Sequence, residues 1–162
     1  MEYLLDTNVF IQAKDLHYGF DFCPAFWDWI IEKNASNQVF SIEKVEAELI
    51  GYGDELSDWA KQRGNKFFLP PDNTIVSCFA KVGNWVKSQN YSQAAMNTFF
   101  QVADFYLIAY ALAQSRIVVT HERPQNGKHK VKIPIVCIGL NIRCMSPFEM
   151  LHVEHARFIL GH

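Results

Sequence analysis

Short apolar runs alternate along this chain with longer stretches in which apolar residues recur every three or four positions. The opening run, residues 2–6, is apolar enough to form a central strand of a sheet. The β-branched runs at 116–120 and 134–139 predict two further buried strands, and residues 38–41 predict a short one. The stretches between these runs have the spacing of helices.

Several of these helical stretches begin with residues that favour a helix start. Pro24 begins one helix, because proline is favoured in the first turn, and Ser41 is a good N-cap for another. The capping box SPFE at 146–149 predicts a last helix that runs towards Ile159. We expect helices over residues 24–33, 42–50, 54–63, 72–87, 93–114 and 147–159. The fifth is long enough to contain a kink or a break.

Strands that alternate with helices predict a single α/β domain over residues 1–162, with a central, mostly parallel β-sheet flanked by α-helices. An apolar fraction of 49% suffices for one core, and no Ser/Gly/Pro-rich linker marks a domain boundary. Ligands of such sheets bind beyond the carboxyl ends of the strands. Asp6 and Thr120 each stand at such an end.

Composition limits where the protein acts and what it binds. The formal net charge is -2, so any contact with nucleic acid must come from a local basic patch. The four cysteines, at positions 23, 78, 137 and 144, form no C-x-x-C pair and suit reduced thiols in a cytoplasmic protein. We expect neither a signal peptide nor a membrane span, because no basic start or long apolar run is present.

Two acidic residues lie in apolar surroundings. Asp104 is the only charged residue of QVADFYLIAYALAQ, residues 101–114, and Asp6 follows the apolar opening run. A buried carboxylate is costly unless it is paired, protonated or bound to a cation. One such aspartate is as readily explained by a helix cap or a salt bridge. Two of them in one small domain favour a shared site.

The helix that follows Ser41 offers glutamates as further candidates. At about 100° per residue, the apolar side chains of Ile42, Val45 and Leu49 form its buried stripe. Glu46 and Glu48 flank this stripe on opposite sides. Periodicity therefore leaves both glutamates open, and a solvent-facing role is the default for each.

The strand that ends at Thr120 is followed by His121 and Glu122, which would stand at the same edge of the sheet as Asp6. Carboxylates that crowd together repel, so a cluster of them is stable mainly when divalent cations occupy it. Oxygen ligands suit Mg²⁺ or Mn²⁺. Such ions can activate water and stabilise charge on a phosphodiester under attack.

Four segments, in this order, resemble the PIN domains, the metal-dependent ribonuclease fold of VapC-type toxins. They are LLDTNVFI at 4–11, SIEKVEAEL at 41–49, ADFYLIAYAL at 103–112 and VVTHE at 118–122. D-T-N alone is a weak motif, but the ordered set spans most of the chain. The sequence THE followed by KIP-x-x-C, here Lys132 to Cys137, most resembles a PIN-like branch long labelled as of unknown function.

This resemblance implies roles for four acids. Asp6, Glu48, Asp104 and Glu122 would be the catalytic residues and would hold Mg²⁺ or Mn²⁺. Asp6 matches the first metal-binding Asp of the family, and Asp104 matches the Asp that opens the alanine- and leucine-rich helix. The resemblance selects Glu48 over Glu46, a choice that periodicity leaves open.

The polar neighbours of these acids have expected roles as well. Asn8 would orient Asp6 or a water molecule on the metal, and Thr120 would support the same site. Glu122 departs from the family pattern, since many relatives carry Asn or Asp after the corresponding Thr. Its role is therefore the least strongly implied of the four.

A basic segment follows directly on Glu122. Residues 123–132 contain Arg123, Lys128, Lys130 and Lys132 and no acid. These side chains could hold the RNA backbone beside the metal site. A solvated loop without a ligand is the alternative.

Taken together, these features predict a Mg²⁺- or Mn²⁺-dependent endoribonuclease, the toxin of a prokaryotic toxin–antitoxin pair. Its expected partners are RNA, a cognate antitoxin and, as is common among PIN toxins, a second copy of the chain. The alternatives are a PIN-fold module that binds RNA or protein without turnover, and a nuclease directed at DNA.

Two other interpretations of the sequence have less support. Haloacid-dehalogenase-type phosphatases also begin with an Asp after a strand, but they need a second Asp where this chain has Asn8. The two histidines of HVEH at 152–155 lack a third zinc ligand, and we expect them on an exposed helix.

Overall fold

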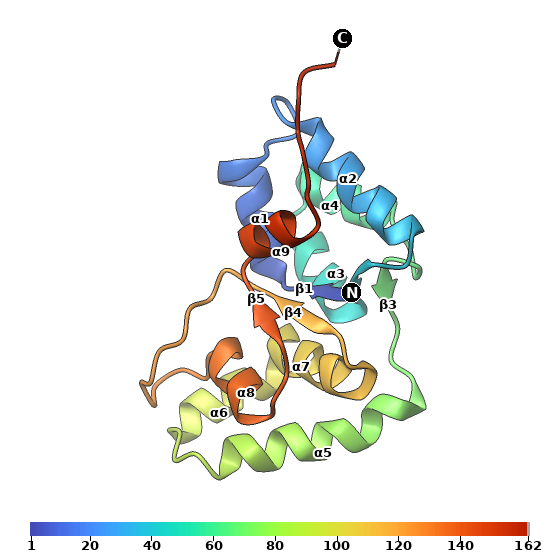
Figure 1. The fold of residues 1–162 in the computed structure, drawn as a ribbon. Helices are drawn as coiled ribbons and strands as arrows, with labels where there is room; N and C mark the ends of the chain where they lie inside the picture. Colours follow the sequence, from blue (N-terminus) through green and yellow to red (C-terminus); the bar gives the residue numbers. More distant parts are fainter. Residues whose placement is uncertain (162) are drawn as a thin grey trace.

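Five short strands form one sheet in the order β3-β2-β1-β4-β5, in which every neighbouring pair is parallel. The computed structural model describes residues 1–161 (Figure 1). The strands are β1 (Tyr3–Leu5), β2 (Val39–Ile42), β3 (Phe68–Leu69), β4 (Ile117–Val119) and β5 (Cys144–Met145). The central strand β1 is fully buried, as its unbroken apolar sequence predicts.

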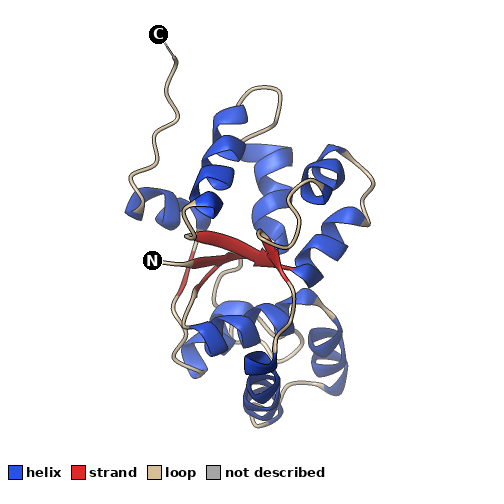
Figure 2. Cartoon of the chain, turned by 90° about the vertical axis from the view of Figure 1, so that its right-hand side faces the viewer, coloured by secondary structure: helices blue, strands red, loops and turns tan. Residues whose placement is uncertain are grey.

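Helices cover both faces of this sheet (Figure 2). One side carries α1 (Thr7–Gln12) with its π-helical continuation η1 (Ala13–His17), α2 (Pro24–Ala35), α3 (Glu43–Ile50), α4 (Glu55–Lys61) and α9 (Pro147–Val153). The other side carries α5 (Asn73–Lys87), α6 (Gln93–Gln101), α7 (Ala103–Gln114) and α8 (Ile133–Gly139). The expected α/β architecture, with a parallel sheet between helices, is confirmed.

The strand predicted over 134–139 is wrong, because this segment forms helix α8. Pro134 stands in its first turn, a position that proline favours, and Val136 and Cys137 are buried. A short apolar run fits a buried helix as well as a buried strand, so periodicity alone did not separate them. The edge strand that pairs with β4 is instead β5, which has two residues.

Other element boundaries agree only in part with the expectation. The break for which the sequence left room in the helix over 93–114 lies at Val102, whose extended backbone separates α6 from α7. The last helix keeps its capping box at Ser146 but ends at Val153, short of Ile159. Ser41 is not an N-cap: it lies in β2, and its hydroxyl donates a 2.6 Å hydrogen bond to the Leu5 carbonyl.

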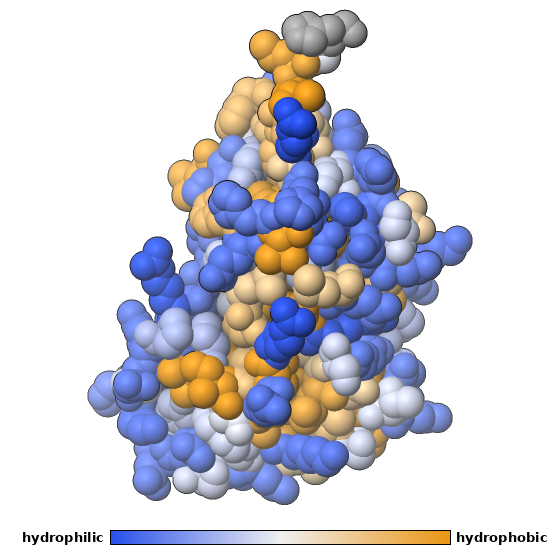
Figure 3. Space-filling model, viewed as in Figure 1, coloured by the Kyte–Doolittle hydropathy of each residue, from blue (hydrophilic) through white to orange (hydrophobic). Residues whose placement is uncertain are grey.

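On the face shown in Figure 3, polar side chains predominate at the margins. Apolar side chains gather down the middle of this face and over α8, where Ile138 is 69% exposed. Both histidines of the HVEH segment are exposed, as expected, although α9 ends before the second. None of the helices in residues 1–161 has the length and apolar character that crossing a membrane requires.

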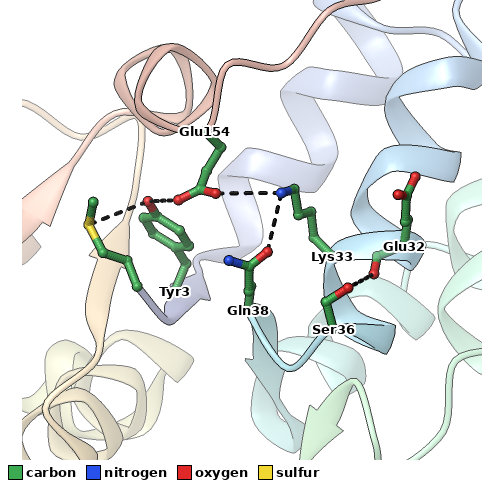
Figure 4. A network of polar contacts seen from close by, with 7 residues as sticks. Tyr3, Glu32, Lys33, Ser36, Gln38 and Glu154 are labelled. Atoms are coloured by element: carbon green, nitrogen blue, oxygen red, sulfur yellow. Dashed lines mark hydrogen bonds and ion pairs between the residues drawn. The ribbon is translucent and has the colours of Figure 1, made fainter.

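A polar network ties the end of α9 to the start of the sheet (Figure 4). The hydroxyl of Tyr3, in β1, donates a 2.6 Å hydrogen bond to Glu154, whose other carboxylate oxygen lies 3.5 Å from the ammonium of Lys33. Lys33 also donates to Gln38, just before β2. Burial, together with the Glu154 carboxylate, raises the pKa of Tyr3, so the phenol stays protonated and remains a donor.

We expect Glu154→Ala to destabilise the protein by about 1–3 kcal/mol, because it leaves the buried Tyr3 hydroxyl without its acceptor. Urea unfolding measures the change. The exposed Glu32, one residue from Lys33, provides the control Glu32→Ala, which should have little effect. In a Tyr3→Phe background the cost of Glu154→Ala should shrink. An equal cost in both backgrounds would contradict this role of the hydrogen bond.

Candidate active site

Asp6 occupies the carboxyl end of the central strand. Its backbone N–H donates to the Val119 carbonyl at 2.9 Å, which continues the pairing between β1 and β4. Its carboxylate receives one hydrogen bond from the Thr7 N–H at 2.7 Å and another from the Thr120 hydroxyl at 2.8 Å. The residue is only 3% exposed. Asp6 is therefore a buried carboxylate held at both oxygens, and it also caps α1.

Glu48 reaches the same edge from α3. One of its carboxylate oxygens accepts a 2.5 Å hydrogen bond from the Thr7 hydroxyl, and the other accepts a 3.0 Å bond from the Ala103 N–H. The N-cap residue of α7, Val102, has no side chain that could cap the helix, so Glu48 does this from another part of the chain. These bonds go to Glu48 and not to Glu46, the other glutamate that periodicity left open.

Asp104 lies in the first turn of α7, next to Ala103. Burial raises its pKa to about 7, and the neighbouring carboxylates of Glu122 and Glu48 act in the same direction. The ammonium of Lys130 partly opposes this rise. Asp104 is thus brought together with the two glutamates, as the sequence predicted.

Glu122 caps α8. One of its carboxylate oxygens accepts a 2.8 Å hydrogen bond from the N–H of Ile133, the first residue of that helix. Its own N–H donates to the Thr120 hydroxyl at 3.1 Å. Since the sequence analysis assigned 134–139 to a strand, it could not foresee this contact.

Asn8 acts on Asp6 only indirectly. Its amide donates to the Thr120 hydroxyl at 3.2 Å, and its side-chain oxygen accepts a hydrogen bond from the His121 N–H at 3.1 Å. Asn8 therefore fixes the end of β4 against α1, and Thr120 passes this constraint to Asp6. Asn8 thus reaches Asp6 through Thr120, and its expected role towards a water on the metal stays a prediction.

Thr7 is the contact residue that the sequence analysis missed. It donates to Asp6 through its backbone and to Glu48 through its hydroxyl, and so joins two of the acids. The only signal for it was the middle position of the D-T-N motif.

Three helix N-termini meet at this cluster of acids. Asp6 caps α1, Glu48 caps α7 and Glu122 caps α8. The partial positive charge of a helix N-terminus favours a carboxylate. This attraction does not fully offset burial and the repulsion between the carboxylates. Burial and the charges of Asp104 and Glu122 raise the pKa of Asp6, although the Thr120 hydrogen bond lowers it.

These acids fit a divalent cation by donor type, charge and burial. All the donors are carboxylate oxygens, which Mg²⁺ and Mn²⁺ favour, and an ion would relieve the repulsion that raises the pKa values of Asp6 and Asp104. Within residues 1–161, however, no three His, Cys, Asp or Glu side chains already have the spacing of a metal site. Glu48 and Glu122 are drawn towards the two helices that they cap.

The basic segment 123–132 is anchored beside this cluster. The carbonyl of Lys128 accepts a 3.0 Å hydrogen bond from the Ser92 N–H at the start of α6, and its ammonium lies 4.9 Å from the centre of the Tyr91 ring. Lys130 instead faces Asp104 closely enough to lower its pKa. Asp104, His129 and Lys130 line a cavity of about 260 Å³ with residues of α6. Lys128 therefore lies against Tyr91, whereas Lys130 lies beside one of the acids, Asp104.

The sequence and the fold were compared with those of known proteins. The family model described as "Domain of unknown function (DUF4411)" matches residues 3–158. The fold is similar to that of a FitAB complex bound to an IR36 DNA fragment, with a TM-score of 0.55, 19% identity and coverage of 99% of this chain and 98% of that chain. No curated protein matches the sequence significantly.

A second similar structure is VapBC2 from Rickettsia felis, bound to a DNA fragment from the promoter of its genes. Its TM-score is 0.54 and its identity 12%, over 90% of this chain and 97% of that chain. Both neighbours contain PIN domains, so the predicted PIN-like α/β fold is confirmed. The narrower assignment to one PIN-like branch stays a prediction.

The raised pKa of Asp104 predicts how stability depends on pH. Between about pH 4 and pH 7 the folded protein keeps a proton that the unfolded chain loses, so stability should fall as the pH rises through this window. Asp104→Asn cannot ionise. At a pH of about 8 it should be more stable than the wild type by about 1–2 kcal/mol, or roughly 3–6 °C in Tm, and the gain should vanish near pH 4.

Thermal melting of the metal-free protein across this pH range measures the effect. Asp28→Asn, at an exposed position of α2, is the matched control and should follow the wild-type curve. A loss of stability in Asp104→Asn at pH 8 would show that the charged carboxylate supports the fold.

Proposed function

The chain belongs to the family described as Domain of unknown function (DUF4411) and has the PIN-like fold, and from this premise we propose that it is a Mg²⁺- or Mn²⁺-dependent endoribonuclease. The observation that carries the proposal is the convergence of Asp6, Glu48, Asp104 and Glu122 at the carboxyl edge of the sheet, where α/β proteins bind ligands. The proposed reaction is hydrolysis of RNA phosphodiesters.

In this proposal the four carboxylates supply oxygen donors to the cation. The ion, when bound, lowers the pKa of water and stabilises the charge that develops on the phosphodiester. Thr7 and Thr120 hold Asp6 and Glu48 in place, so that the ligands are oriented before the ion arrives. Lys130, beside Asp104, is positioned to contact a phosphate of the RNA strand.

We further propose that the protein is the toxin of a prokaryotic toxin–antitoxin pair, with an antitoxin as its partner and a homodimer as its assembly. The support is the similarity of its fold to the FitAB and VapBC2 complexes, which are toxin–antitoxin assemblies. The DNA in both neighbouring structures belongs to those complexes.

A PIN-fold module that binds RNA or protein without turnover is the second candidate. One observation favours it: Glu48 and Glu122 are engaged as helix caps, and within residues 1–161 the acids lack the spacing of a finished metal site. A module of this kind would bind no ion at the acids.

A pair of variants on α3 tests the enzyme against the module. With Mn²⁺ at about 100 times its Kd, the wild type should gain about 2.7 kcal/mol of stability and should cleave RNA. Glu48→Gln keeps a side-chain oxygen for the Ala103 N–H, yet it should lose most of the Mn²⁺ stabilisation and should cleave slower by orders of magnitude. Glu46→Gln should change neither the Mn²⁺ stabilisation nor the rate of RNA cleavage by much.

Thermal melting with and without Mn²⁺ and cleavage of matched RNA and DNA oligonucleotides are the measurements. An unchanged Tm in Mn²⁺ together with no cleavage would favour the inert module. Cleavage of DNA in preference to RNA would assign the site to a DNA nuclease.

The two lysines of the basic segment should differ in their contribution to RNA binding. If Lys130 contacts a phosphate, Lys130→Ala should reduce the slope of log affinity against log salt by about 0.7, the value for one contact to a single strand. Lys128→Ala should reduce it less, because its ammonium lies over the Tyr91 ring. Filter binding over a salt series measures both slopes, and equal changes would contradict the distinction.

A further inference from the structure

Three aromatic rings from three separate segments meet near the end of β4. They belong to His17, the last residue of η1, to His121, which follows β4, and to Phe148 in α9. The ring centres lie 5.6 Å apart for the two histidines, 5.1 Å for His17 and Phe148, and 5.5 Å for His121 and Phe148. We refer to these three residues as the ring cluster.

The ring cluster lies outside the hydrophobic core. Phe148 is 41% exposed and both histidines are half-buried, and the ring centre of His17 also lies 6.0 Å from that of Tyr18. The neighbouring Tyr18 ring, by contrast, stacks on the buried Phe26 with 4.3 Å between centres. Tyr18 therefore links His17 to the core, whereas Phe148 stays exposed.

Backbone contacts fix one member of the ring cluster, His121, between two residues of the acidic site. His121 stands between Thr120, which donates to Asp6, and Glu122, and consecutive Cα atoms are about 3.8 Å apart. The His121 N–H donates to Asn8, so the position of this residue is fixed to α1. The π-helical turn η1 continues α1 and ends at His17, and such turns are frequent at functional sites. His121 therefore directly precedes one of the acids, Glu122, and its ring contacts the other two rings.

Exposed rings beside a basic segment are the features that bind single-stranded nucleic acid. Unpaired bases stack on aromatic side chains, histidine included, while cationic groups follow the backbone. The basic segment 123–132 begins two residues after His121 and contains no acid. A small apolar ligand would have no use for that charge.

From this arrangement we propose that the ring cluster stacks on one unpaired base of the RNA strand, close to the phosphodiester that is cleaved at the acids. This inference rests on the proposed function and deepens it, since it names single-stranded RNA as the substrate and Phe148 as a contact to a base. Because every base has a π face, the contact would favour a splayed base without selecting its identity.

Phe148 provides the sharpest test, because it is the most exposed ring and is not bonded to the acids. Phe148→Leu keeps an apolar side chain without a π face, and Phe148→Trp keeps the π face. Binding of a fluorescein-labelled eight-nucleotide RNA is measured by anisotropy in EDTA, and cleavage is measured in Mn²⁺. Phe148→Leu should weaken binding and raise KM about fivefold or more, whereas Phe148→Trp should bind at least as tightly as the wild type.

A series of RNAs, each lacking the base at one position, separates stacking from structural damage. One abasic position should weaken wild-type binding, and on that RNA the wild type and Phe148→Leu should be equal. His152→Ala, at an exposed position of the same helix, is the control and should match the wild type on every RNA. A loss in Phe148→Leu that persists at every abasic position would overturn the stacking role.

The outcomes also separate this inference from the proposed function. If the wild type neither binds RNA in EDTA nor cleaves it in Mn²⁺, the proposed function fails and the stacking role falls with it. If the wild type binds or cleaves RNA and Phe148→Leu equals it on every RNA, only the stacking role is overturned.

Discussion

The burial of one carboxylate, that of Asp6, is the constraint on which the rest of the site depends. A negative charge at the end of a fully buried strand is costly unless donors surround it. Thr7 and Thr120 supply those donors, and Asn8 holds Thr120 in turn. Each of these residues lies where β1 or β4 ends, so the parallel pairing of the two strands creates the environment that Asp6 requires.

The same physical solution recurs at the other acids. Among residues 1–161, Glu48 and Glu122 form no ion pair with lysine or arginine. Each satisfies the N-terminus of a helix that lacks a capping side chain of its own. Helix ends therefore fix the carboxylates, and the carboxylates fix the helix ends. The carboxylates still repel one another, as the raised pKa of Asp104 indicates. Because protons or cations would relieve this repulsion, the cluster responds to both.

The sequence could predict those parts of the fold and the site that have a local cause. An apolar run that ends in Asp6 indicates a strand and an acid at its edge, and an isolated Asp104 in an apolar helix indicates a second acid. Periodicity could not choose between Glu46 and Glu48, because the contact that distinguishes them is made with the start of α7; only the resemblance to PIN domains selected Glu48. The same holds for α8, whose residues 133–139 are apolar enough for either a strand or a helix.

The hydrogen bond between Tyr3 and Glu154 joins residues 151 positions apart. Together with the pairing of β1 and β4, it makes the centre of this sheet depend on contacts of very long range along the chain. Such contacts form late, since loop closure precedes any gain from them. During synthesis Asp6 leaves the ribosome before its partner Thr120, and Tyr3 leaves it before Glu154. The acids at the edge of the sheet can therefore assemble only after Glu122 has been synthesised.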